Sequence, residues 1–430
     1  MKRIYILLAV LAGLSVKHTA IAQQFYICQQ GNVSTAQELT FSDGGTTVNG
    51  QYATTDIDSI TLDVPALRFV GGDVSLLPSY CDHGAQYKTH TGTLITTAPT
   101  GDGRLKQMLQ FFRQQGLNTL RVRLFVNPAN ASSTDKGQGV CQDLAYVTRL
   151  AKAIKAEGLL LLLDFHYSDS WADPAKQWTP GEWLSLDDES LGRKLYDYTK
   201  DCLETLVQAG AVPDFIQTGN EISYGMLWGA QGSSRNRCYA SSDANWPRFT
   251  TLLKQAGRAC REVCPRAKII LHTERVPNVG TLTDFYRRMN LAAVDYDIIG
   301  LSYYSYYHGT LAKLEAAVKQ MKQSYPGKKV HIVETGYCSQ YGITVEGSGY
   351  DYSSQYPYTD EGQRQFAAAL VSTLKRNDNV SGLSWWMCEA NEYGLNWSTN
   401  RVTDSWYNAS LFSNSTGQAC SALQELKNFR

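Results

Sequence analysis

Short apolar segments alternate along the chain with longer amphipathic ones, and this alternation most constrains the fold. The segments that match buried strands are Leu67–Gly71, Thr119–Phe125, Leu159–Phe165, Phe215–Gly219, Ile269–His272, Asp297–Ser302, Lys329–Glu334 and Gly382–Trp386. Residues 159–163 are all leucine. A strand without polar alternation is typical of a sheet covered on both faces, so a parallel sheet is expected.

The segments between these strands have the spacing of helices. Leu144, Val147, Ala151 and Ile154 form one apolar stripe that ends before Gly158. Similar stretches that end at Gly or Pro cover residues 191–209, 246–263 and 311–324. Eight strands with helices between them are the pattern of a TIM barrel, so residues 67–430 are predicted to form one (β/α)8 domain of the α/β class.

Two segments precede the predicted barrel. Lys2 and Arg3, a short apolar run from Ile4 to Val16 and the small residues before Gln23 indicate a signal peptide over residues 1–22. Residues 23–66 contain two or three short β-like runs, within Gln24–Gln29, Glu38–Phe41 and Ile57–Leu62, between turn signals. We therefore expect an exported protein, periplasmic, cell-surface or extracellular, with a small β-rich N-terminal extension.

Composition narrows the classes of partner. The chain of 430 residues has 40 Lys+Arg and 40 Asp+Glu, which argues against binding to a nucleic acid backbone. Its 26 Tyr and 9 Trp suit a neutral ligand with stackable faces. No apolar run after residue 22 is long enough to span a membrane, and a monomer is expected. The ten cysteines lack zinc-ligand spacing, Cys260 and Cys264 included, so no metal site is predicted.

Two glutamates are the candidate catalytic pair. Glu221 follows Gly219-Asn220 at the end of the fourth predicted strand, and Glu334 ends the seventh. In a TIM barrel the reacting groups lie at the carboxyl ends of the strands, where closure brings distant strands around one opening. Retaining glycoside hydrolysis needs two carboxyl groups about 5 Å apart, one as acid and one as nucleophile.

The second and third strands supply further candidates for the site. Arg121 and Arg123 alternate along a strand and point to one side, where at least one is expected to keep Glu334 ionised. For Arg123 alone, a salt bridge to a structural Asp fits equally well. Asp164 and His166 share one face at the end of the third strand, and we expect His166 at the opening with Trp171 on the loop above.

Aromatic residues and one more carboxylate complete the set. Trp386 is expected to line the cleft. Either Tyr303 or Tyr304 should do the same; the sequence does not separate them, and Tyr304 is kept as the candidate. Glu274 ends the fifth strand and is interpreted as a partner for an Arg or a sugar hydroxyl, not as a catalytic group.

These motifs resemble glycoside hydrolase family 53, the endo-β-1,4-galactanases, from about Leu67 to the C-terminus. The matching strings are Gly72-Asp73-Val74-Ser75, Arg121-x-Arg123, Asp164-x-His166-x-Ser168-Asp169-x-Trp171-Ala172-Asp173-Pro174, Gly219-Asn220-Glu221-Ile222, Ser302-Tyr303-Tyr304 and Val333-Glu334-Thr335. The resemblance implies retaining, endo-acting cleavage of pectic galactan and type I arabinogalactan.

It further implies roles for individual residues. Glu221 would be the acid/base, Glu334 the nucleophile and Asn220 the donor to the sugar 2-hydroxyl, with Trp386 under the reacting galactose. Two positions depart from the family pattern: Glu389 does not follow the usual Trp-Glu-Pro string, and residues 338–359 lack the Asp-x-Asp pattern with which some relatives bind calcium. No cofactor is therefore assigned.

Two other functions remain open from sequence. A related barrel enzyme could cleave another β-linked glycan such as mannan or glucan, because loops determine which sugars fit. A non-catalytic glycan-binding protein could use the same scaffold. The presence of both Glu221 and Glu334 argues against the second.

Overall fold

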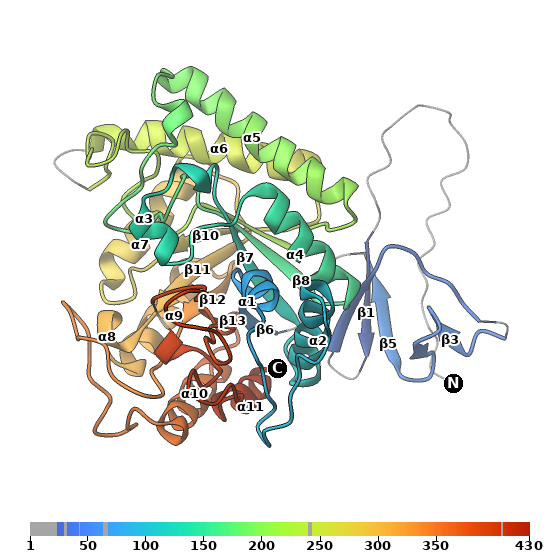
Figure 1. Cartoon of the computed structure of the whole chain (residues 1–430). Coiled ribbons are helices and arrows are strands. Elements are labelled where there is room, and N and C mark those ends of the chain that lie inside the picture. Colours follow the sequence, from blue (N-terminus) through green and yellow to red (C-terminus); the bar gives the residue numbers. More distant parts are fainter. Residues whose placement is uncertain (1–23, 30–31, 43, 63–67, 240–242, 406) are drawn as a thin grey trace.

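A closed barrel of eight parallel strands forms the centre of the molecule (Figure 1). The computed structural model describes residues 24–29, 32–42, 44–62, 68–239, 243–405 and 407–430. The predicted signal peptide and Leu67 lie outside these residues. The barrel strands run in chain order: β6 (Phe69–Asp73), β7 (Thr119–Leu124), β8 (Leu160–Phe165), β9 (Phe215–Thr218), β10 (Lys268–Thr273), β11 (Ile298–Tyr303), β12 (Lys329–Thr335) and β13 (Val380–Trp385).

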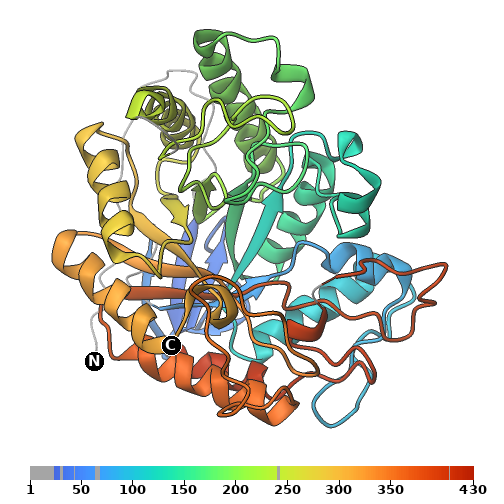
Figure 2. The same cartoon turned by 90° about the vertical axis from the view of Figure 1, so that its left-hand side faces the viewer.

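Helices surround the strands as a ring, which is clearest in the turned view of Figure 2. They are α1 (Leu77–His83), α2 (Gly101–Gln114), α3 (Ser133–Gly137), α4 (Leu144–Ala156), α5 (Asp188–Gln208), α6 (Trp246–Val263), α7 (Val279–Leu291), α8 (Ser305–His308), α9 (Leu311–Ser324), α10 (Asp360–Lys375) and α11 (Ala422–Leu426). Short 3-10 turns are η1 (Pro128–Asn130), η2 (Gly181–Trp183), η3 (Asp243–Asn245), η4 (Tyr407–Ala409) and η5 (Lys427–Phe429). Among the described helices, none combines the length and the apolar character that a membrane crossing requires.

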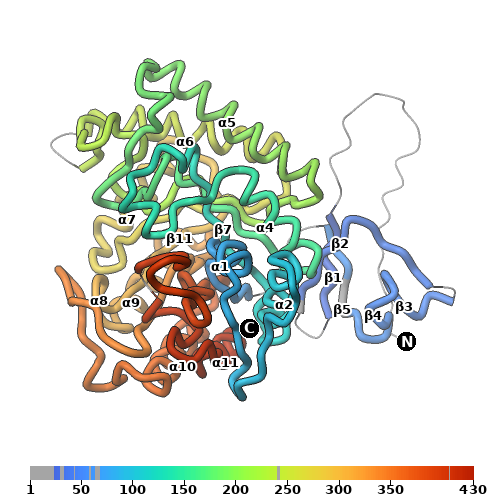
Figure 3. The backbone as a smooth tube through the Cα atoms, in the orientation of Figure 1, coloured from blue at the N-terminus to red at the C-terminus, as the bar shows by residue number. Residues whose placement is uncertain are grey.

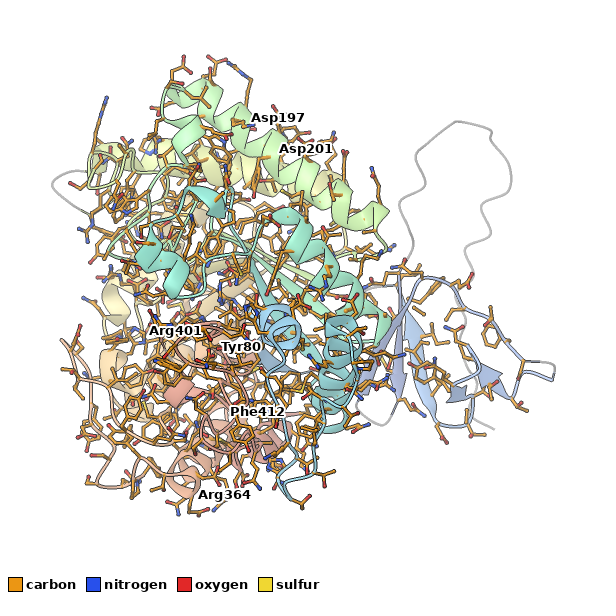
Figure 4. The ribbon with its side chains drawn as sticks, in the orientation of Figure 1. Tyr80, Asp197, Asp201, Arg364, Arg401 and Phe412 are labelled. Atoms are coloured by element: carbon orange, nitrogen blue, oxygen red, sulfur yellow. The ribbon has the colours of Figure 1, made fainter. Side chains whose placement is uncertain are left out.

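Local sequence explains where these helices begin and which face they bury. Asp143 and Asp187 precede α4 and α5, and their carboxylates accept hydrogen bonds from backbone N–H groups of the first turn. On α5, Asp197 and Asp201 lie one turn apart on the outer face and are exposed (Figure 4), while Leu195 is buried against the barrel. The amphipathic pattern therefore directs one face of the helix toward the strands.

The predicted barrel is confirmed. Each of the eight predicted strands lies within two residues of an observed one, and α6 and α9 have the predicted bounds. The predicted strand at Glu38–Phe41 is wrong, because the second strand of the extension is β2 (Asn32–Ala36) and Phe41 makes only an isolated bridge to Val48. Residues 32–36 contain one large apolar side chain, Val33, so their sequence carries almost no strand signal.

The N-terminal strands lie together at one end of the barrel (Figure 3). β1 (Phe25–Gln29) pairs antiparallel with β2 and β5 (Ile57–Thr61), and β3 (Thr47–Val48) pairs with β4 (Tyr52–Ala53). Tyr26 and Val33 of this sheet share an apolar cluster with Phe69, Leu160 and Phe215, which stand at the starts of three barrel strands. The extension thus covers the end of the barrel where the strands begin.

A polar anchor fixes the same contact. Gln24 donates a side-chain hydrogen bond to Asp214 Oδ1 at 2.5 Å, and Lys155 lies 2.7 Å from Asp214 Oδ2. Asp214 is fully buried and also accepts the Leu161 backbone N–H at 2.7 Å. A buried carboxylate is costly without partners, and Lys155 and Gln24 both supply them. Of the two, Gln24 belongs to the extension, so its hydrogen bond connects the extension to the barrel.

We expect this contact to contribute to global stability. Replacing Tyr26, which is 2% exposed, with Ala should lower the free energy of unfolding by about 3 kcal/mol, because a large buried side chain is removed from the shared cluster. Phe41→Ala is the matched control: Phe41 is 49% exposed and its loss should change stability by less than about 0.5 kcal/mol. Urea denaturation of both variants measures the difference, and equal midpoints would show that the extension does not share the barrel core.

Candidate active site

A cavity of about 600 Å³ opens where the barrel strands end. Its wall includes both candidate glutamates, Glu221 and Glu334, together with side chains from the loops after β8, β10 and β11. Of the candidates from sequence, those on the wall are His166, Trp171, Asn220, Glu221, Tyr304, Glu334 and Trp386, and Glu274 lines the same cavity. The structure therefore brings residues from six strand ends to one opening.

The turn after β9 aims Glu221 at this cavity. Gly219 has φ +108°, a conformation that favours glycine because it has no Cβ. Glu221 itself has φ +47°, which is uncommon for a residue with a side chain. The sharp turn at Gly219 places Asn220 and Glu221 on the cavity wall, two and three residues after β9 ends at Thr218.

Glu334 is held by a cation and a hydroxyl. Arg121 Nη2 lies 2.8 Å from Glu334 Oε1, and the Tyr304 hydroxyl donates to Oε2 at 3.2 Å. Burial raises the pKa of Glu334 to about 7, and the Arg121 guanidinium opposes this rise because it favours the charged form. Both oxygens of the carboxylate are thus occupied by donors, which fixes its orientation.

Glu221 has a different environment. Ser302 donates its hydroxyl to Glu221 Oε1 at 2.6 Å, and His272 Nε2 lies 2.8 Å from the same Ser302 oxygen. His272 Nδ1 accepts the Glu221 backbone N–H at 3.2 Å, so the ring proton is on Nε2 and points to Ser302. Burial, followed by the nearby Glu334 carboxylate, raises the pKa of Glu221 well above its usual value.

The two carboxyl groups therefore differ in the ease with which they lose a proton. Glu334 is buried and Glu221 is partly exposed, and of the two only Glu334 contacts a guanidinium. Glu334 should ionise first, and its charge then favours the protonated form of Glu221. Since Ser302 occupies Oε1, the proton of Glu221 belongs on Oε2.

Three sequence candidates lie beneath the cavity and not on its wall. Arg121, Arg123 and Asp164 are fully buried. Arg121 bridges Asp73 Oδ2 at 2.9 Å, Asp164 Oδ2 at 2.7 Å and Glu334. Arg123 contacts Asp73 Oδ1 at 2.9 Å and reaches the site only through its guanidinium, 4.7 Å from the ring centre of Trp171. Of the two arginines, Arg121 is the one that contacts Glu334.

Aromatic rings form one side of the cavity. Trp386 has edge contacts with Trp171 and with Tyr304, each with ring centres 6.4 Å apart. Tyr303, the other tyrosine of the open pair, is fully buried and donates to the Gly309 carbonyl oxygen at 2.8 Å. Successive residues at the strand end point to opposite sides, so Tyr303 is buried in the core and Tyr304 lies at the cavity.

Asn220 and His166 are tied to one loop. Asn220 donates one N–H to the Ala172 carbonyl oxygen at 2.7 Å, and Arg121 donates to Asn220 Oδ1 at 2.9 Å. The Ala172 backbone N–H donates to His166 Nδ1 at 3.2 Å. The loop after β8 thus holds both side chains, and the second N–H of the Asn220 amide is left for a ligand.

Sequence reasoning missed several residues that the geometry brings to this site. Among them, Ser302 and His272 contact Glu221. Both residues end a predicted strand, and this position was the signal that could have identified them. The sequence does not show which strand ends lie next to Glu221. The wall residues that were not predicted as site residues are Gln138, Ala172, Asp173, Pro174, Ala175, Lys176, Tyr307, His308 and Glu346. Among the described residues, no group of three His, Cys, Asp or Glu side chains is placed to hold a metal ion.

Comparison with known proteins gives consistent matches. Residues 70–426 match the model of glycosyl hydrolase family 53. An arabinogalactan endo-β-1,4-galactanase from Thermothelomyces thermophilus is 30% identical over 296 residues, 66% of this chain and 82% of that protein. The solved GH53 catalytic domain from Ignisphaera aggregans superposes with TM-score 0.70 at 29% identity, covering 85% of this chain and 96% of the other. A solved structure from work on two fungal β-1,4-galactanases gives TM-score 0.67 at 28% identity, covering 83% and 98%.

The contact between Tyr304 and Glu334 gives a prediction about charge. Tyr304→Phe removes the hydroxyl that donates to Glu334 Oε2 and should raise the pKa of Glu334, because that hydrogen bond favours the ionised form. Carboxyl titration of ¹³C-glutamate-labelled protein by NMR measures it. Tyr303→Phe is the control, since its hydroxyl contacts Gly309 and not the site. If Tyr304→Phe left the Glu334 titration where it is in the parent, the hydrogen bond would have no electrostatic role.

Proposed function

The chain belongs to glycosyl hydrolase family 53, and from that membership and the geometry of its cavity we propose that it is an endo-acting β-1,4-galactanase. It is a glycoside hydrolase whose substrate is pectic galactan and the related type I arabinogalactan. The named relatives of similar sequence and structure support this substrate. The observation that carries the proposal most directly is the pair Glu221 and Glu334 on one cavity wall with opposite electrostatic surroundings.

The difference between these glutamates supports a retaining double displacement. Glu221, partly buried beside other carboxylates, supplies the proton to the leaving oxygen from Oε2. Glu334, paired with Arg121, attacks the anomeric carbon as an ionised carboxylate, and the C–O bond to the leaving sugar breaks. A covalent glycosyl ester results. Glu221, now ionised, then takes a proton from water as the water displaces Glu334, which restores both groups and the original anomeric configuration.

The other wall residues fit sugar binding. Trp386, between Trp171 and Tyr304, offers an aromatic face for the ring in the reacting position. Asn220 has one free N–H and is assigned the contact with the 2-hydroxyl next to the reacting carbon. His166, held by Asp164 and the loop after β8, is assigned a contact with another hydroxyl of the same sugar. Arg121, Arg123 and Asp164 act from below by orienting these groups.

Location and organisation are part of the proposal. The predicted signal peptide over residues 1–22 supports export, which suits an enzyme whose substrate is a large polymer. We assign residues 23–66 to a small β extension and residues 67–430 to the catalytic barrel. The apolar cluster that joins them supports a structural role for the extension, beneath the barrel and away from the cavity. A monomer would suffice, since all the proposed catalytic groups come from one chain.

The substrate is tested by measuring reducing-end release from β-1,4-galactan, mannan and β-glucan. We expect galactan to be cleaved at least tenfold faster than the other two, with internal cuts that shorten the polymer quickly. NMR of the first product should show the β-anomer before mutarotation, because two displacements retain configuration. Faster cleavage of mannan or glucan would show that the enzyme has a different substrate. Binding without product release would show that the protein is a glycan-binding protein.

The two glutamates should respond differently to substitution. In Glu221→Gln, an aryl galactoside with a very good leaving group should still form the covalent intermediate at near-parental rate, because it needs little protonation, while turnover of galactan falls by about 10³-fold. In Glu334→Gln, both substrates should lose turnover by a similar or larger factor, while galacto-oligosaccharide binding by calorimetry persists. Stopped-flow release of the aryl group measures the first step. Equal loss on both substrates in Glu221→Gln would contradict its role as acid.

A further inference from the structure

Glu274 is a third buried carboxylate on the cavity wall, next to the proposed acid. It follows β10 directly, is 9% exposed and lines the cavity with Glu221 and Glu334. The double displacement gives it no part, since one acid and one nucleophile suffice. A carboxylate buried at this position costs free energy unless its contacts compensate, so its contacts should reveal its role.

The first contact ties two strand ends together. The Ser223 hydroxyl donates to Glu274 Oε2 at 2.5 Å. Ser223 lies two residues after Glu221, in the turn that carries the proposed acid at φ +47°. Ser223 is fully buried, so this hydrogen bond lies inside the protein. Glu274 therefore anchors the Glu221 turn to the end of β10.

A second contact favours the ionised form of Glu274 against the effect of burial. Arg275 Nε lies 3.0 Å from Glu274 Oε1, and the Arg275 guanidinium lies 4.0 Å from the ring centre of Tyr224. Arg237 covers the same ring at 4.1 Å. Burial raises the pKa of Glu274, while Arg275 and the Ser223 hydroxyl lower it. Tyr224 follows Ser223 in the Glu221 turn. Its contact with Arg275 therefore provides a second connection between this turn and the end of β10.

We propose that Glu274 is a positioning residue for Glu221: it fixes the turn that carries the acid, and its negative charge favours the protonated form of the acid. The role rests on the proposed function, in which Glu221 must hold a proton when substrate binds. Its physical basis is that a like charge near a carboxyl group in a buried site makes ionisation harder. Among the charges that raise the pKa of Glu221, Glu274 follows Glu334.

Charged and polar groups from several elements surround Glu221. The groups that face it are Glu334 from β12, Glu274 directly after β10, Asp173 from the loop after β8, Ser302 from β11, His272 from β10, Tyr304 directly after β11 and Tyr307 from α8. His272 is neutral, because burial and the Arg121 charge hold its pKa well below the usual value. Asp173 acts more weakly on Glu221 than Glu274 does. Glu334 cannot be substituted to test this effect, because it is the proposed nucleophile. Glu274 has the next largest effect on the pKa of Glu221, and its charge can be removed without removing a reacting group.

The test compares Glu274→Gln with Glu274→Ala. The amide keeps a hydrogen-bond partner for Ser223 and removes the charge, whereas alanine removes both. The alkaline limb of kcat/KM on galactan reports loss of the Glu221 proton, so a lower Glu221 pKa moves this limb to lower pH. Both variants should move it down by about 0.5–1 pH unit. Only the alanine variant should also lower kcat at the pH optimum, by at least tenfold, because the turn loses its anchor.

Two controls make the outcome specific. Glu189→Gln removes one negative charge from the exposed surface of α5 and should leave the limb unchanged. Carboxyl NMR titration of Glu221 in Glu274→Gln measures the pKa directly, without any substrate, so the result stands even if galactan proves not to be cleaved. An unmoved Glu221 titration in Glu274→Gln would overturn the electrostatic role. Equal kcat at the optimum for the amide and alanine variants would overturn the anchoring role.

Discussion

One buried guanidinium holds the catalytic end of this barrel together. Arg121 contacts Asp73, Asp164 and Glu334 at 2.7–2.9 Å, and these carboxylates belong to β6, β8 and β12. Because arginine stays protonated in proteins, the positive charge is permanent and the carboxylates around it must remain paired with it. A buried charge that loses its partner is strongly destabilising, so this cluster leaves little freedom in how the strand ends meet. The position of Glu334 follows from that constraint.

The same cluster separates the properties of two chemically identical residues. Glu334 receives donors on both oxygens, from Arg121 and Tyr304. Glu221 receives one, from Ser302, and otherwise faces carboxylates. Solvation is poor for both, so the neighbours decide which group keeps its proton. The division into acid and nucleophile thus depends on where the barrel places Arg121, and Glu274, on the same cavity wall, adds to the difference between the two glutamates.

The sequence predicted the barrel well because its strands are encoded locally. Each strand is an apolar run between turn signals, and the leucines at 160–163 form a strand that is buried throughout. The error at Glu38–Phe41 arose where strand pairing, not apolar periodicity, defines the element. The site was predictable as far as strand ends could be recognised: Glu221, Glu334 and Trp386 stand where expected. The relay from His272 through Ser302 to Glu221 was not, because it depends on which neighbouring strands meet and in what register.

Three of these strand ends carry a strained backbone conformation, and the strain has a structural reason. The residues after His166 and Trp386, Tyr167 and Met387, have φ values of +51° and +46°, and Glu221 adopts the same left-handed region after Asn220. Such a conformation costs a non-glycine residue roughly 1 kcal/mol. A more gradual turn after each strand would direct the side chains of His166, Glu221 and Trp386 away from the barrel axis. The sharp turns keep them on the cavity wall, and buried neighbours such as the Tyr167 ring, stacked on Phe165 with centres 5.0 Å apart, offset the strain. The rigidity that the chemistry requires is therefore produced by the packing behind the site.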